Sequence, residues 1–171
     1  MDADLPLLVL RLVLGAVFVL HGWNHGFGAG GLAGTTRWFD SLGLRPARVH
    51  ALVSTWLELA VGVALLAGLL TPFAAAGGIG IMATAFVTVH RPNGFFIFRD
   101  GYEYVLVVAA SLTALAMLGP GSWSVDDALG LRDDLVGWEW GAGAFVLAVV
   151  ATAGMLATCW RPPAKDDAAQ A

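Results

Sequence analysis

Five ionisable residues stand inside or at the ends of long apolar runs in this sequence of 171 residues: Arg11, His21, Glu58, His90 and Glu103. A charge at the centre of a bilayer costs about 2.5–3.5 kcal/mol even on lenient insertion scales, so each of them needs an explanation. Histidine and carboxylate side chains exchange protons near neutral pH, and both also ligate metal ions. The five residues are therefore the first candidates for a site.

The composition indicates the environment of these residues. Hydrophobic residues make up 58% of the chain and charged residues only 13%, about half of the share in a soluble domain. The net charge of −4 provides no basic field, which excludes nucleic acid as a partner. The single cysteine, Cys159, permits neither an internal disulfide nor a paired-cysteine motif. The sequence therefore predicts an all-α integral membrane protein.

Five apolar runs can cross about 30 Å of hydrocarbon as helices that rise 1.5 Å per residue. They cover residues 5–23, 49–70, 72–90, 102–118 and 138–160. Thr71 and Pro72 read as a cap and a first helical residue, which makes the second and third runs a tight antiparallel hairpin. Small residues in the third run predict a central position in the bundle.

Two further features concern the ends of the bundle. Thr35 is predicted to cap a short interfacial helix with Trp38, Phe39 and Leu42 on its apolar face. Seven of the nine basic residues fall in the first loop, the third loop and the tail. Because basic loops stay in the cytoplasm, we expect the N-terminus outside the plasma (inner) membrane and the C-terminus inside.

The helix directions bring most of the ionisable residues together. The first and third runs lead toward the basic side, and the second and fourth runs start from it. Four groups from four helices are therefore predicted to converge at similar depth, whichever way the bundle is inserted. They are His21, Glu58, His90 and Glu103, with His25, Tyr102 and Tyr104 nearby.

Arg11 is the exception, because it lies nearer the opposite face. Its long side chain can extend to that interface. Alternatively, the Arg11 side chain points into the bundle, on the face that it shares with Gly15, Phe18 and Gly22. There it would reach down the bundle to form an ion pair with Glu58.

Several chemistries fit the predicted cluster. A quinone head group needs a proton donor and acceptor just below the interface, which histidine and glutamate supply. The HxxxH spacing of His21 and His25 also suits a metal, and His90 with either of them could hold a haem. We prefer a quinone or similar amphiphile and assign no metal ligand. The alternative is that these side chains only form hydrogen bonds that order the helices.

Across roughly residues 5–130 the chain resembles the DoxX family of small bacterial membrane proteins. The motifs that carry this resemblance are Arg11, His21-Gly22, residues 34–46 with Trp38-Phe39, Glu58, residues 68–72, Met82, Tyr102-Glu103 and the segment Gly119-Pro-Gly-Ser-Trp-Ser-Val-Asp126. Residues 35–39 and 94–96 resemble the actinobacterial branch. Many members carry a lysine after the His-Gly pair, where this chain has Asn24 and His25.

The resemblance implies a four-helix transmembrane bundle over residues 1–130. Residues 131–161 then add an acidic loop and a fifth transmembrane helix, and residues 162–171 form a flexible tail. The family is linked to thiosulfate:quinone oxidoreductase subunits and to mycobacterial membrane complexes that handle oxidative and thiol stress. We expect a membrane subunit of such an oxidoreductase assembly that binds a quinone, with lipid and other subunits or a second copy as partners. The alternative is a non-catalytic anchor, accessory subunit or lipid-binding bundle, and whether the chain is an enzyme stays open.

Overall fold

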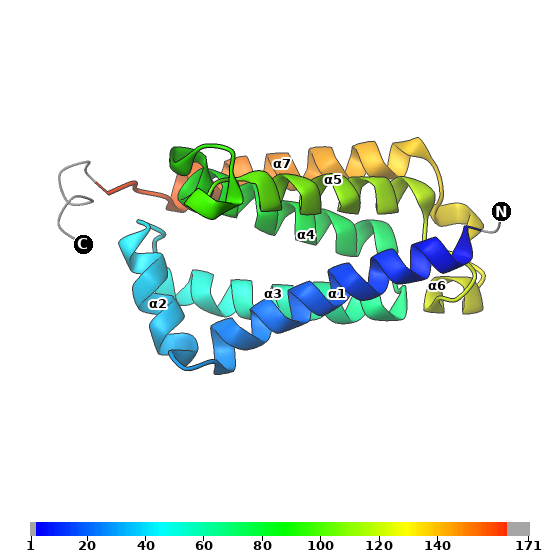
Figure 1. Ribbon diagram of the computed structural model, residues 1–171, viewed down its shortest axis with the longest axis horizontal. Helices are drawn as coiled ribbons and strands as arrows, with labels where there is room; N and C mark the ends of the chain where they lie inside the picture. Colours follow the sequence, from blue (N-terminus) through cyan, green and yellow to red (C-terminus); the bar gives the residue numbers. More distant parts are fainter. Residues whose placement is uncertain (1–2, 164–171) are drawn as a thin grey trace.

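Helices account for most of residues 3–163, the part of the chain that this computed structural model describes (Figure 1). In chain order the α-helices are α1 (Asp4–Phe27), α2 (Gly31–Ser41), α3 (Ala47–Ala67), α4 (Thr71–Ala85), α5 (Glu103–Leu118), α6 (Val125–Ala128) and α7 (Trp138–Cys159). Short helical turns follow α4 at Phe86–His90 and Arg91–Asn93, and others lie at Ile97–Arg99 and Asp133–Leu135. The prediction of an all-α membrane bundle is confirmed. The predicted tail falls mostly beyond residue 163, outside the described residues.

Among the described residues, four helical segments are long and apolar enough to cross a membrane: Asp4–Phe27, Ala47–Ala67, Thr71–Asn93 and Trp138–Cys159. They correspond to the first, second, third and fifth predicted runs. The fourth run forms α5, an apolar helix of 16 residues that would span about 24 Å at 1.5 Å per residue. The chain is a multi-pass membrane protein.

Glycines set the closest helix pairing, between α1 and α3. A Cβ on Gly15 would come within 2.9 Å of the Gly62 carbonyl, and a Cβ on Gly62 within 2.7 Å of the Val19 backbone nitrogen. Only a residue without a side chain lets the two backbones approach so closely. Small residues have this role in membranes, where water does not drive apolar helices together.

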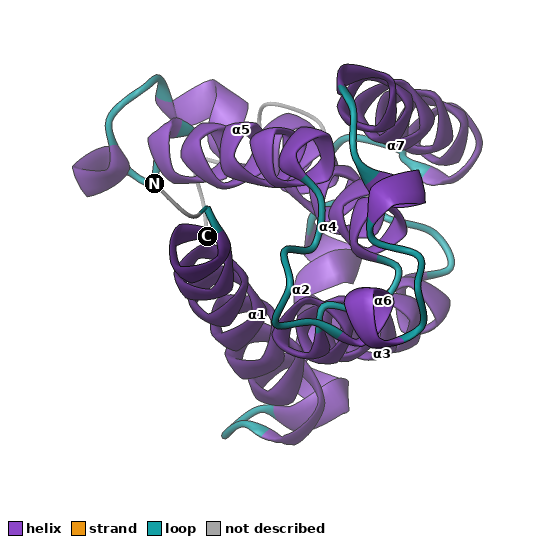
Figure 2. Ribbon diagram, turned by 90° about the vertical axis from the view of Figure 1, so that its right-hand side faces the viewer, coloured by secondary structure: helices purple, strands orange, loops and turns teal. Residues whose placement is uncertain are grey.

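The helix α4 is central, as its small residues predict. It packs against α3, α5 and α7, and Figure 2 shows it between α3 on one side and α5 and α7 on the other. Ala74, Ala75, Ala76 and Gly78 of α4 are buried in these contacts.

Two predicted helix starts are wrong. Thr35 does not cap α2, which begins at Gly31; its hydroxyl instead donates to the His25 carbonyl over 2.8 Å and ties α2 to the end of α1. Thr71 is the first residue of α4 rather than its cap, because its hydroxyl donates to Asp126. The hairpin itself forms as predicted, with Gly68 in the left-handed conformation that ends α3.

The bundle has two distinct ends, which we name the α2 end and the α6 end (Figure 1). At the α2 end, the α2–α3 connection pairs with the end of α7: Arg45 N donates to Cys159 O and Arg161 N to Gly43 O, each over 2.8 Å. The N-terminal residues of α1 and the short helix α6 lie at the opposite end. The α2 end is also the end that carries the basic loops.

Candidate ligand-binding site

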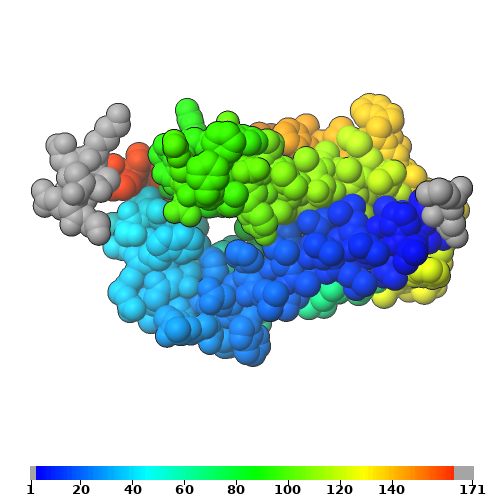
Figure 3. Space-filling model, viewed as in Figure 1, coloured from blue at the N-terminus to red at the C-terminus, as the bar shows by residue number. Residues whose placement is uncertain are grey.

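A cavity of about 570 Å³ lies inside the bundle toward the α2 end. Side chains from α1, α2, α3, α4, α5 and α7 form its walls, and most of them are apolar. In Figure 3 the surface is hollowed between the α1–α2 region and α5. All four histidines of the chain line this one cavity: His21, His25, His50 and His90.

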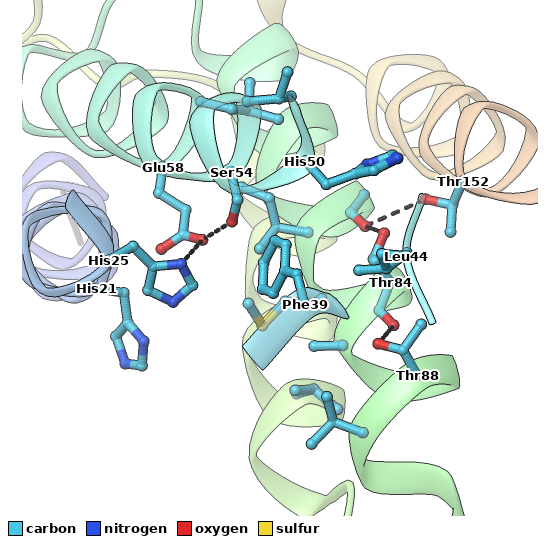
Figure 4. A pocket seen from close by; sticks show the side chains of 18 of the residues that line it. His21, His25, Phe39, Leu44, His50, Ser54, Glu58, Thr84, Thr88 and Thr152 are labelled. Atoms are coloured by element: carbon cyan, nitrogen blue, oxygen red, sulfur yellow. Dashed lines mark hydrogen bonds and ion pairs between the residues drawn. The ribbon is translucent and has the colours of Figure 1, made fainter. Parts of the chain in front are cut away.

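Glu58 is the buried acid of this site (Figure 4). The helix α3 carries it into the bundle, where only 3% of the residue remains exposed. The Ser54 hydroxyl, one turn earlier on the same helix, donates a hydrogen bond of 2.6 Å to Glu58 Oε1. Because a buried carboxylate needs partners, this short bond fixes the orientation of the group.

Two histidines of α1 face Glu58. His25 Nδ1 lies 3.9 Å from Glu58 Oε1, which is too long for a hydrogen bond. The nitrogen is buried and has no hydrogen-bond partner among residues 3–163. Ligand atoms of His21, His25 and Glu58 all lie within 4.8 Å of one another. Figure 4 shows the His25 ring against the carboxylate and the His21 ring on the far side of His25.

Aromatic rings surround these two imidazoles. Trp38 and Phe39 of α2 meet the His25 ring edge-on, with centroids 5.8 and 5.9 Å away. Tyr104 of α5 stacks near His21 at 6.5 Å. The rings fix the imidazole positions and give the cavity flat apolar walls.

Gly22 brings α1 close enough for this geometry. It lies between His21 and His25, and a Cβ at this position would come within 2.9 Å of Leu59 N and Thr55 O on α3 and within 3.0 Å of Glu58 Cβ. Since backbone atoms of α3 occupy that space, any larger residue would push the helices apart. The glycine thus sets the separation between the histidines and the glutamate.

The other two histidines lie elsewhere on the cavity wall. His90 Nδ1 is 2.7 Å from the Asp100 carbonyl, and His50 Nε2 is 3.3 Å from the Arg45 carbonyl. His90 was among the predicted residues, whereas the sequence reasoning missed His50 and Ser54. Their spacing is the signal that could have found them, because His50, Ser54 and Glu58 recur every four residues on one face of α3.

Two predicted residues lie near the α2 end but do not line the cavity. The Oε2 atom of Glu103 accepts a hydrogen bond of 3.0 Å from Ile97 N, within the loop that precedes α5. The Tyr102 ring packs edge-on against Phe86 and Phe95, at 5.2 and 5.6 Å. The structure therefore clusters His21, His25 and Glu58, places His90 elsewhere on the same cavity wall, and leaves these two residues outside.

Arg11 lies at the α6 end and points into the bundle, as the second alternative predicted, but the expected partner is wrong. It does not extend to the interface, because only 1% of the residue is exposed. It does not pair with Glu58 either, since its guanidinium donates to the Trp123 carbonyl and lies against Gly68. Its face is as predicted, since Gly15, Phe18 and Gly22 are buried with it.

The arrangement combines groups that exchange protons with an apolar cavity inside a membrane bundle. Cavities that bind small molecules measure about 300–1,000 Å³ and combine apolar walls with a few polar groups, which describes this one. Glu58, His21 and His25 form a compact polar group on one wall, and aromatic rings adjoin it. The site can therefore hold a flat amphiphile and exchange protons with it.

Comparison with known proteins gave one match. The family model described as DoxX matches residues 6–91, half of the chain. The matched stretch runs from α1 to the first turn after α4, and it includes Glu58 and all four histidines. No curated protein and no solved structure matches the sequence.

Proposed function

Because this chain belongs to the DoxX family of membrane proteins, we propose that it is the membrane subunit of a quinone-linked oxidoreductase assembly and that its cavity holds the quinone head group. One observation carries the proposal: an apolar cavity of about 570 Å³ gathers Glu58 and every histidine of the chain. The family resemblance to thiosulfate:quinone oxidoreductase subunits supports the same chemistry.

Quinone chemistry accounts for both kinds of residue in the cavity. Reduction of a quinone to a quinol takes up two electrons and two protons. Glu58 and His25 can supply or accept protons at the ring oxygens. This chain contributes the binding site and the proton-exchanging groups. A partner subunit of the assembly supplies the electrons. The rings of Phe39 and Tyr104 provide surfaces for the quinone ring.

The hollow between α1 and α5 supplies a route from the lipid (Figure 3). His21 is exposed on the α1 side and Tyr104 stands opposite it on α5. A head group entering there passes between these two side chains and reaches Glu58, while its apolar tail stays among the lipid chains. With the orientation that the basic residues predict, this route opens in the cytoplasmic half of the membrane.

The first test replaces the buried acid. Glu58→Gln keeps the side-chain volume and a hydrogen-bonding oxygen, so the bundle should stay folded, but the amide cannot exchange a proton. We expect at least a severalfold loss of co-purified quinone, measured per chain by solvent extraction and mass spectrometry. Glu139→Gln is the matched control, because Glu139 is exposed at the start of α7.

The second test fills the cavity. Ala148 of α7 is 3% exposed and lines the cavity, so Ala148→Phe should displace the quinone. Ala153→Phe on the exposed side of the same helix is the control and should retain it. If both cavity variants keep the quinone of the parent, and Glu58→Leu merely loses about 0.6–2 kcal/mol of stability, the polar group only orders the helices and the proposal fails.

A further inference from the structure

The geometry points to a divalent transition-metal site formed by His21, His25 and Glu58. Their ligand atoms lie within 4.8 Å of one another, two on α1 and one on α3. Around a tetrahedral ion with bonds of about 2.0–2.1 Å, ligand atoms stand about 3.3 Å apart. Side-chain rotations that close the cluster by about 1–1.5 Å would therefore complete the coordination.

The fold prepares this cluster independently of any ligand. His25 follows His21 by four positions along α1, which places both imidazoles on one face of the helix. Gly22 between them keeps α3 at contact distance and so delivers Glu58 to both rings. The three ligands therefore come from the most closely packed helix pair in the bundle, where a site can be rigid.

His25 shows what the cluster lacks. Its Nδ1 is buried and has no hydrogen-bond partner in the described part of the chain, although Glu58 Oε1 lies 3.9 Å away. An unpaired buried polar atom is costly, and a cation between the ring and the carboxylate would satisfy both groups. Ser54 donates to the carboxylate from outside the cluster, as hydrogen-bonding partners of metal ligands commonly do.

The donor set indicates the kind of ion. Two imidazole nitrogens and one carboxylate suit zinc, iron, nickel or cobalt, whereas magnesium and calcium prefer oxygen ligands alone. Structural zinc sites are usually closed by four protein ligands, and sites with three keep a position open for water or substrate. Here the open position would face the cavity, so a bound ion could contact an oxygen atom of whatever the cavity holds.

A second hollow gives an ion a polar approach. It measures about 360 Å³ at the turn between α1 and α2, and Asn24, Thr35 and several glycines line it. His25 and Trp38 belong to the walls of both hollows. An ion arriving from the loop side would thus meet His25 without crossing the apolar interior.

The test uses the full chain, purified in detergent through a tag without histidine, treated with a chelator and titrated with Co²⁺ and then Zn²⁺. We expect one ion per chain, visible absorption of Co²⁺ typical of nitrogen ligation, and a rise in thermal stability. Even an outer partner of a metal ligand is worth about 10–100-fold in metal affinity, so His21→Gln, His25→Gln and Glu58→Gln should each weaken binding by at least about tenfold.

His50→Gln and His90→Gln are the matched controls, because both histidines line the same cavity and lie outside the proposed ligand set. Thermal unfolding with chelator present shows which variants fold. The metal affinity of any one folded ligand variant, compared with that of the parent chain, is enough to test the site. Affinity that is equal in the parent and the ligand variants, or lost equally in the controls, would overturn the site.

The metal site goes beyond the proposed function and does not rest on it. The quinone content of each preparation is measured by solvent extraction of a separate sample, and the titration uses the remaining folded protein. A chain that binds the ion but co-purifies no quinone keeps the metal site and loses the proposed function. A chain that co-purifies quinone but binds no ion keeps the function and loses the metal site.

Discussion

Both ends of the bundle bury an acidic side chain, but the two acids have very different surroundings. At the α6 end, Asp126 is fully buried and accepts three hydrogen bonds of 2.7–3.0 Å, from Leu70 N, Thr71 N and the Thr71 hydroxyl. At the α2 end, Glu58 accepts one bond from Ser54 and faces a cavity. The first carboxylate is saturated with donors from the protein, and the second has capacity left for a ligand.

The surroundings of Asp126 explain the role of the segment that follows α5. Asp126 N donates to Gly68 O, and Ser122 N donates to a carboxylate oxygen of Asp4. Together with the bond from Arg11 to the Trp123 carbonyl, these contacts fasten the loop to α1 and to the α3–α4 turn. The α6 end therefore holds the helices in place, while the α2 end leaves a polar group available for binding.

Removing the acid at the α6 end should have the largest effect on stability. Asp126→Ala leaves the buried N–H and hydroxyl of Thr71 and the partly buried Leu70 N–H without their acceptor, at about 1–3 kcal/mol for each buried unmet group. We expect a loss of about 3–5 kcal/mol in the free energy of unfolding, measured by thermal or denaturant unfolding in detergent. Asp133→Ala is the control, because that side chain is 92% exposed, and it should stay within about 0.5 kcal/mol. A small loss in Asp126→Ala would contradict the contrast between the ends.

A methyl group at the contact between α1 and α3 should act on both stability and the site. In Gly22→Ala the new Cβ meets backbone atoms of α3 at 2.9 Å, so the helices must separate. Overpacking of this kind costs about 1–3 kcal/mol, and the separation should also lower quinone content and metal affinity. Gly154→Ala meets nothing within 4 Å and gains helix propensity, so it should be neutral or stabilising by up to about 1 kcal/mol. Full ligand occupancy in Gly22→Ala would separate the site from this helix contact.

Most of the fold could be predicted because its elements are local. Apolar runs, glycines and proline identify the five long helices, and small residues identify α4 as the central one. The helix starts at Thr35 and Thr71 were predicted wrongly because each hydroxyl bonds a partner outside its own helix: Thr35 reaches His25 O and Thr71 reaches Asp126, which lies 55 residues away. A capping pattern in a sequence cannot reveal such a long-range acceptor.

For the site, the sequence could predict only how deep in the membrane each residue lies along its helix. Depth placed His21, Glu58, His90 and Glu103 at one end, as the structure does. It cannot tell which way a side chain turns, and that turn separates Glu58 in the cavity from Glu103 in the loop. Depth also gives no reason to select Ser54, because only the hydrogen bond to Glu58 distinguishes it from other residues of the helix.

Glu103 therefore provides the smallest predicted effect and a direct check on the assignment of the site. Glu103→Ala removes the acceptor of a single exposed bond to Ile97 N, so we expect a loss of only about 0.5–1 kcal/mol in the free energy of unfolding. Glu103→Gln keeps an accepting oxygen and should be nearly neutral. Neither change should alter quinone content or metal affinity, because the side chain faces the loop and not the cavity. The comparison with Glu58→Gln is informative because the two substitutions have the same chemistry and lie at the same end of the bundle. A loss of quinone in Glu103→Gln as large as in Glu58→Gln would return Glu103 to the site and would show that depth alone, without side-chain direction, determines the binding residues.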